Sequence, residues 1–426
     1  MVNLPPDKAG RLKRSMARKV LIIGAVWPES KSSAAGQNMS GLLRAFHQHG
    51  FALTFATAAT DSIHADGFNN LPVTSMQIAI NDASFDNVIC ELQPDIVVFD
   101  RFMTEEQFSW RIRKHCPNTL HILNTEDLHS LRYARHEAVK RAGHANCAEL
   151  NNAFAHREIA AILRSDISLI ISAHEYDLLI NTYQVPARQL VLLPLQPPAD
   201  TPACQQQCSF TQRQHFMTVG NFRHAPNWDS VLQLHQHIWP TIRKQLPYAE
   251  LHIYGAYPPK KATELHNPAK GFLVKGWVED VNTVMAQARV CLAPLRFGAG
   301  VKGKLLTALR HNTPSVTTSV GAEGIAAEED WCGVVASDNH DFIQAAVNLY
   351  TDQSMWQQAS DRCSALFEHY QQSVINGNRQ LFDKIAQAMN DIQGYRAPLY
   401  QQGLVWHHSL RSTQFMSQWI EAKNRV

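Results

Sequence analysis

The sequence predicts an α/β protein built from two Rossmann-like, doubly wound parallel sheets. In both halves, short apolar runs alternate with segments whose apolar residues recur at helical spacing. A proline- and glutamine-rich stretch at 194–207 interrupts this alternation. With 426 residues, 45% of them hydrophobic, the chain can bury two cores. We therefore expect a basic flexible arm at 1–19, a first domain at 20–195 and a linker at 196–212. A second domain is expected at 213–390, followed by a C-terminal tail ending in a helix at 391–426.

Composition narrows the function classes. A net charge of only +2 argues against nucleic acid as a main partner. The 8 cysteines form no C-x-x-C pair, so we expect a reducing, cytosolic setting without disulfides. Cys204 and Cys208 have no histidine-rich neighbour, and we expect no metal site there. No stretch approaches the roughly 20 apolar residues that span a bilayer, so a soluble protein is expected.

The arm at 1–19 is strongly basic, with Asp7 as its single acidic residue. Its basic residues are Lys8, Arg11, Lys13, Arg14, Arg18 and Lys19. A solvated, disordered arm is the favoured interpretation. The alternative is a weak electrostatic tether to anionic lipid.

The first half begins with a continuous apolar run at Val20–Ala25, which is typical of a central parallel strand. Further strands are predicted at 51–57, 73–78, 95–99, 120–123 and 167–171. Helices are predicted from about Gln37 to Gly50, and at 83–92, 104–115, 132–164 and 173–183. Ligands of such sheets bind at the carboxyl ends of the strands.

Charged clusters follow two of these strands. Asp100 and Arg101 come after one strand, and the run 124–129 (NTEDLH), followed by Arg132 and Arg135, comes after the next. This run can simply cap the next helix, with Thr125 or Asp127 as N-cap. It can equally form a charged site, because histidine titrates near neutrality and arginine pairs with carboxylates and phosphates.

In the second half, strands are predicted near 215–219, 251–255 and 290–293. The run 274–280 is predicted to lead into a helix with Asp280 as its N-cap. Long helices are predicted at 339–350, 353–370 and 373–391, and a terminal amphipathic helix carries Phe415, Trp419 and Ile420.

A glycine-rich loop between the strand at 290–293 and a helix beginning near Val301 carries the clearest chemistry. Gly298 and Gly300 permit a tight turn and close approach of a ligand, and a helix N-terminus presents unpaired N–H groups. Arg296, Lys302 and Lys304 add cations, so the loop predicts binding of an anion such as a diphosphate. The alternative is a tight turn with solvated lysines. The spacing matches neither G-x-G-x-x-G nor G-x-x-x-x-G-K-[ST].

These runs carry a family resemblance. The run GAGVKGKLLTAL, the residues 314–318 (PSVTT) and 321–324 (GAEG), and the run VGNFRHAPNWDSV resemble the sugar-nucleotide-binding half of family-four glycosyltransferases, which have the two-domain GT-B fold. FDRFMTEEQFSW and LNTEDLHSLRYAR resemble their acceptor-side half. The resemblance implies transfer of a sugar from a nucleoside diphosphate sugar to a glycan or lipid-linked acceptor, with retention and without metal or another cofactor. It also implies a C-terminal helix that crosses back to the first domain. From the cysteine usage and the basic arm we expect a cytoplasmic protein, peripheral at the inner membrane surface if the arm binds lipid.

Site residues follow from the same resemblance. Catalytic roles are implied for His129, Lys302 and Arg296. Donor-binding roles are implied for Arg223, Trp277, Val278, Gly298, Gly300, Val301, Lys304 and Thr307. Acceptor-side roles are implied for Asp100, Arg101, Glu126, Asp127 and Arg132.

The sequence departs from the family at two positions. Many family-four enzymes carry two glutamates in an E-x7-E pattern, and here Ala299 and Thr307 occupy those positions. A hydroxyl in place of the second carboxylate loses about 1 to 2 kcal/mol of charge-assisted hydrogen bonding. A non-catalytic GT-B module that binds a sugar nucleotide or a partner is therefore the alternative to an enzyme.

Overall fold

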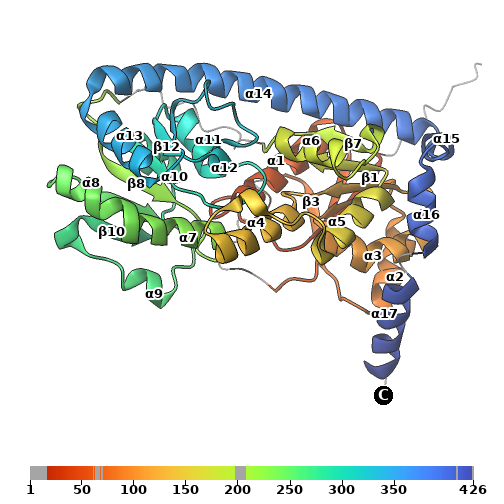
Figure 1. The fold of residues 1–426 in the computed structure, drawn as a ribbon. Coiled ribbons are helices and arrows are strands. Elements are labelled where there is room, and N and C mark those ends of the chain that lie inside the picture. The colour runs from red at the N-terminus through yellow and green to blue at the C-terminus, as the bar shows by residue number, and fades with distance from the viewer. Residues whose placement is uncertain are drawn as a thin grey trace, which may run out of the picture.

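The computed structural model describes residues 17–60, 62, 68, 71–196, 208–408 and 411–424. Two parallel sheets lie side by side, each with helices on both faces (Figure 1). The predicted fold class is confirmed. Most of the basic arm and of the linker, with Cys204, lies outside the described residues.

The N-terminal sheet has seven parallel strands in the order β3-β2-β1-β4-β5-β6-β7. Its strands are β1 (Lys19–Gly24), β2 (Ala52–Thr57), β3 (Val73–Gln77), β4 (Ile96–Asp100), β5 (Leu120–Asn124), β6 (Ile167–Ile170) and β7 (Leu190–Leu192). Residues 20–23 of β1 are at most 1% exposed, because helices cover both faces of the sheet. Strand β7 was not predicted.

The helices of this domain are α1 (Ala34–Gln48), α2 (Ser84–Leu92), α3 (Phe102–His115), α4 (His129–Ala142), α5 (Ala153–Arg164) and α6 (Ala173–Asn181). Helix α1 starts earlier than predicted because Ser33 caps it, accepting a hydrogen bond from the N–H of Gly36. The single predicted helix at 132–164 is wrong. Gly143, at φ +80°, ends α4, and Asn152 caps the separate helix α5.

The C-terminal sheet has six parallel strands in the order β10-β9-β8-β11-β12-β13. They are β8 (Gln214–Val219), β9 (Leu251–Tyr254), β10 (Phe272–Gly276), β11 (Ala288–Ala293), β12 (Ser315–Thr317) and β13 (Gly333–Val335). Its helices are α7 (Ala225–Gln233), α8 (Trp239–Gln245), α9 (Lys260–Thr263), α10 (Val281–Gln287), α11 (Gly303–Arg310), α12 (Ser319–Ala322) and α13 (Asn339–Thr351). Strand order reverses between β8 and β11, which is where such sheets bind ligands.

Helix α14 (Gln353–Asn390) runs along both domains (Figure 1). The prediction of two helices, 353–370 and 373–391, is wrong, because the chain between them is helix-forming and continues unbroken. Gly377, inside α14, allows close packing on the N-terminal domain: a Cβ there would lie 2.6 Å from the carbonyl oxygen of Leu192. The chain then returns to that domain through α15 (Ile392–Arg396), α16 (Tyr400–His408) and α17 (Arg411–Asn424), with α16 against α5 and α17 against α3.

Candidate active site

The loop between β11 and α11 presses directly on the N-terminal domain. A Cβ at Gly300, whose φ is +62°, would lie 2.8 Å from Cβ of Asp127 and 2.9 Å from Cδ1 of Ile171. A Cβ at Gly303 would lie 2.7 Å from Cβ of Ala34. Gly300 is therefore required both for the turn and for the contact between the domains, and Gly303, the first residue of α11, for the contact.

Helix α11 begins at Gly303 with Lys302 as its N-cap residue, and no side chain caps it. Lys302 is 9% exposed; its Nζ donates to the carbonyl oxygen of Gly300 at 2.7 Å and lies 4.0 Å from Oε2 of Glu323. Lys304 Nζ donates to Oδ1 of Asn227 at 2.9 Å. Burial lowers the pKa of each ammonium to about 8. Two cations and the first N–H groups of a helix thus gather at the strand-order reversal.

Arg296 was predicted to offer a third cation to an anion in this loop, and in the structure its charge is paired within the C-terminal domain. Its guanidinium pairs with Asp229 of α7, with Nε 2.9 Å from Oδ2. The hydrogen bond with Asp229 raises the pKa of Arg296 and balances its charge. Arg296 also lines an interdomain cavity of about 660 Å³, together with residues 143–146, 318–320 and 335–339.

On the facing domain, Asp127, His129 and Arg132 form one cluster at the start of α4. His129 Nε2 lies 3.4 Å from Oδ1 of Asp127, and Arg132 donates to the other oxygen of that carboxylate. Burial lowers the pKa of His129 to about 4, so the ring is neutral at pH 7. Burial alone would raise the pKa of Asp127, but Arg132 and His129 outweigh it and hold the pKa below its ordinary value.

The N-terminus of α4 is capped by a residue that the sequence did not reveal. Glu158 of α5 accepts hydrogen bonds from the N–H groups of His129 and Ser130, each at 3.0 Å. Neither Thr125 nor Asp127 caps this helix, which corrects the capping interpretation. Burial raises the pKa of Glu158 to about 7.

A second acidic group lies at the ends of β4 and β5. Glu126 accepts hydrogen bonds from Asn124 at 2.8 Å and Asn38 at 3.2 Å, and Asp100 accepts one from the N–H of Ala25 at 3.1 Å. Burial, with repulsion from Asp100, raises the pKa of Glu126 to about 8. Glu126 and its neighbour Arg101 have left-handed backbones, with φ of +63° and +72°. Such backbone strain is concentrated at functional sites.

Two further carboxylates join the domains, and both were missed. Glu175 accepts from the N–H of Leu128 at 2.9 Å and from the N–H of Gly300 at 2.8 Å. Glu323 receives two hydrogen bonds of 2.7 Å from Arg135, which also donates to the carbonyl oxygen of Gly298. The partners in the two different domains are more than a hundred residues apart in the sequence, so no local spacing could reveal them.

Ala299 and Thr307, at the two positions where many relatives carry glutamate, contact neighbouring residues of the protein. Ala299 is 9% exposed and packs in the hydrophobic cluster of the N-terminal domain. The hydroxyl of Thr307 donates to the carbonyl oxygen of Gly303 at 3.0 Å, within its own helix. Val301 is buried in a cluster that contains residues of both domains, among them Ile171 and Leu305.

The loop after β10 and the loop after β8 carry the remaining residues predicted to bind the donor. Trp277 is 41% exposed and so is not a core residue, and Val278 beside it is half-buried. Arg223 stacks on the ring of Tyr257, 3.5 Å from its centroid. His224, which sequence reasoning passed over, is within electrostatic range of Arg132 and Asp127 across the gap.

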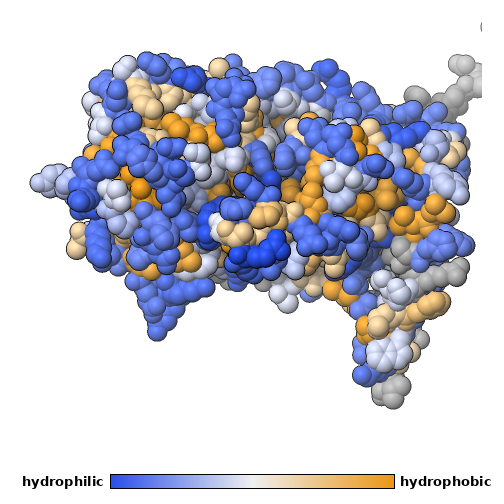
Figure 2. Space-filling view, in the orientation of Figure 1, coloured by the Kyte–Doolittle hydropathy of each residue, from blue (hydrophilic) through white to orange (hydrophobic). Residues whose placement is uncertain are grey.

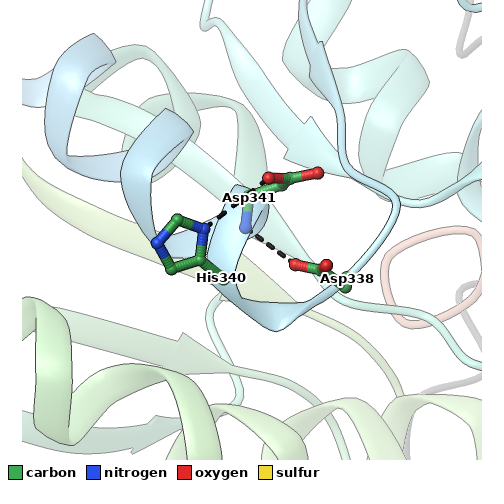
Figure 3. A group of neighbouring side chains, drawn as sticks. All are labelled: Asp338, His340 and Asp341. Atoms are coloured by element: carbon green, nitrogen blue, oxygen red, sulfur yellow. Dashed lines mark hydrogen bonds and ion pairs between the residues drawn. The ribbon is translucent and has the colours of Figure 1, made fainter.

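Among the described residues, one group of side chains has metal-ligand geometry: Asp338, His340 and Asp341 (Figure 3). All three are exposed. Asp338 is the N-cap of α13 and accepts from the N–H of Asp341 at 2.9 Å, which explains the arrangement without an ion. None of the described helices combines the length and apolarity needed to cross a membrane.

Comparison with known proteins finds a family match for part of the chain. Residues 213–352 match the model of a family described as glycosyl transferases group 1. No curated protein matches the sequence.

Among solved structures, the chain is similar to a sucrose-phosphate synthase from Thermosynechococcus elongatus, with 15% identity, a TM-score of 0.62, and 87% of this chain and 100% of the other covered. It is also similar to WaaG, a glycosyltransferase of lipopolysaccharide biosynthesis, with 14% identity, a TM-score of 0.58, and 82% of this chain and 95% of WaaG covered. A third similar structure is HepE of Anabaena, solved with UDP and glucose, with 11% identity, a TM-score of 0.58, and 87% of this chain and 100% of HepE covered. The predicted GT-B fold is confirmed, and residues 213–352 carry the predicted resemblance to glycosyltransferases.

Proposed function

We propose that this chain, a GT-B protein whose residues 213–352 match the group 1 glycosyl transferases, transfers a sugar from a nucleoside diphosphate sugar to a glycan or lipid-linked acceptor. One observation carries the proposal: Lys302 and Lys304 lie at the uncapped N-terminus of α11, inside the family-matched segment and at the interdomain contact. HepE, which shares the fold, holds UDP and glucose, and this makes a nucleoside diphosphate sugar the natural donor to test.

The chemistry proposed for this loop is electrostatic. When the bond between sugar and diphosphate breaks, negative charge builds on the departing phosphate oxygens. Lys302, Lys304 and the first N–H groups of α11 are fixed donors for that charge, and the contact between the domains keeps water away from them. The donor set supplies the positive charge that the leaving group needs, so we propose metal-independent transfer with no further cofactor. Arg296, whose guanidinium is paired with Asp229, is proposed as a third cation near the leaving group.

The acceptor is proposed to bind against the facing cluster of Asp127, His129 and Arg132, with Asp100, Arg101 and Glu126 beside it. A neutral His129 can hydrogen-bond a sugar hydroxyl, and Asp127 can accept from another. Retention of configuration is proposed from the family resemblance. No general base is assigned.

The remaining donor contacts are proposed at the loops around this space. The ring of Trp277, 41% exposed, can pack on the nucleotide base, with the backbone of Val278 beside it. Arg223 is proposed to contact the diphosphate. We also propose a cytoplasmic protein that takes part in polysaccharide or lipid-linked glycan synthesis, with weak membrane contact through the basic arm.

A non-catalytic sugar-nucleotide-binding or interaction module is the alternative. Ala299, buried in the N-terminal cluster, and Thr307, bonded within its own helix, favour it, because neither offers a carboxylate to the donor.

A donor panel separates the two. Release of nucleoside diphosphate is measured for UDP-, GDP- and ADP-sugars, with and without a mixture of glycan acceptors. Turnover with one donor supports the enzyme. Tight nucleotide binding without turnover on any donor or acceptor supports the module.

A further inference from the structure

Helix α17 is docked on the protein by its polar face. Ser417 is 3% exposed, and Ser417 and Glu421, one helical turn apart, both receive hydrogen bonds from Arg111 of α3, at 3.4 and 3.3 Å. Arg111 is held in turn by Asp86 at 2.8 Å. The inward face of this helix is therefore a polar contact, the reverse of the usual surface helix.

The outward face of α17 is apolar. Phe415, Met416 and Trp419 are 62%, 58% and 60% exposed. Their positions, i, i+1 and i+4, place them on one side of the helix. Figures 1 and 2 show α17 projecting from the body of the molecule at lower right, with apolar surface on the projecting part. An amphipathic helix that turns its apolar side outward presents a docking surface.

The charge on this face is positive. The exposed Lys423 lies over the ring of Trp419, 5.4 Å from its centroid. Within 411–424 the single acidic residue, Glu421, is turned inward and paired with Arg111. Exposed aromatic side chains with a lysine beside them are the composition that binds an anionic lipid surface.

The size of the face favours a membrane over a protein partner. Three such side chains, each about three-fifths exposed, present on the order of 400 Å². A stable protein complex buries about 800 Å² on each partner. Insertion into the headgroup region has no such requirement, because each apolar side chain contributes separately.

We propose that the outward face of α17, made by Phe415, Met416 and Trp419 with Lys423 beside them, docks on the surface of an anionic phospholipid bilayer. This surface belongs to the N-terminal domain, which also carries the cluster proposed for the acceptor. The docking is independent of the basic arm and of sugar transfer. Its test therefore needs no donor, and its failure leaves the proposed activity standing.

The test is co-sedimentation of the full chain with vesicles of phosphatidylcholine alone and of phosphatidylcholine with one third phosphatidylglycerol. The chain should bind the anionic vesicles more strongly. The variant Phe415→Ser/Met416→Ser/Trp419→Ser should lower the partition coefficient about 100-fold or more, because losing one buried apolar side chain costs roughly tenfold. Lys423→Glu should weaken binding to the anionic vesicles and leave binding to neutral ones unchanged.

Tyr248→Ser is the matched control, because Tyr248 is 97% exposed and lies in the C-terminal domain. It should bind as the wild type does. The triple variant should keep wild-type turnover on a water-soluble acceptor and a wild-type melting curve. Absence of vesicle binding, or equal binding by the triple variant, would overturn the proposal. So would sedimentation velocity showing a dimer that the triple variant abolishes.

Discussion

Replacing Lys302 by alanine tests the electrostatic role of the loop. Lys302 is 9% exposed, and Ala removes one fixed donor from the place where charge develops on the leaving diphosphate. Loss of a single preorganised donor of this kind costs about 2.7 to 4 kcal/mol of transition-state stabilisation, or roughly 100- to 1000-fold in kcat.

Stability should respond far less. Glu323 keeps both of its hydrogen bonds from Arg135, and the protein loses one hydrogen bond to the carbonyl oxygen of Gly300. The free energy of unfolding should fall by about 1 kcal/mol or less.

The assay measures release of nucleoside diphosphate with the best donor, and urea unfolding of the same preparations. Lys260→Ala is the control, since Lys260 is exposed and its one ion pair, with Glu264, is 3.9 Å long. Turnover of Lys302→Ala within about threefold of the wild type would refute the reasoning, as would a loss of stability large enough to explain the loss of activity.

Three other predictions concern the same contact. Affinity for a nucleoside diphosphate should fall as pH rises above about 8, because Lys302 and Lys304 lose their protons there. Titration calorimetry from pH 7 to above pH 9 measures this affinity, and an affinity that does not change with pH would count against the two lysines. Gly300→Ala should lower both activity and melting temperature, because its Cβ would meet Asp127 at 2.8 Å in a left-handed backbone; an unchanged melting curve would show that the domains do not close as described. Glu175→Ala should lower kcat and loosen the interdomain contact, while Glu175→Gln, which can accept the same two N–H bonds, should keep activity. Hydrogen exchange at residues 298–303 reports the contact, and equal exchange in both variants would contradict the assigned role.

Sequence patterns predicted the architecture because buried parallel strands are continuous apolar runs. Strand β1 is an example, with four residues that are apolar and almost fully buried. The three-residue strands β7, β12 and β13 were missed because runs that short carry no periodicity. The stop at Gly143 was overlooked inside a longer helical pattern, although glycine in a left-handed conformation is a common helix end.

The site could be predicted only where it is local. The loop from Gly298 to Lys304 was found because its glycines and lysines are adjacent in sequence. The carboxylates of Glu158, Glu175 and Glu323 were missed because each acts on a partner that only the fold brings near. The same limit explains Arg296, whose pairing with Asp229 of α7 no spacing within the loop could show.

A crystal structure with a bound nucleoside diphosphate tests the central claim most directly. The diphosphate should lie against the first N–H groups of α11 and within hydrogen-bonding distance of Lys302 or Lys304, with the base beside Trp277. A diphosphate bound elsewhere, with the loop from Gly298 to Lys304 unoccupied, would contradict it.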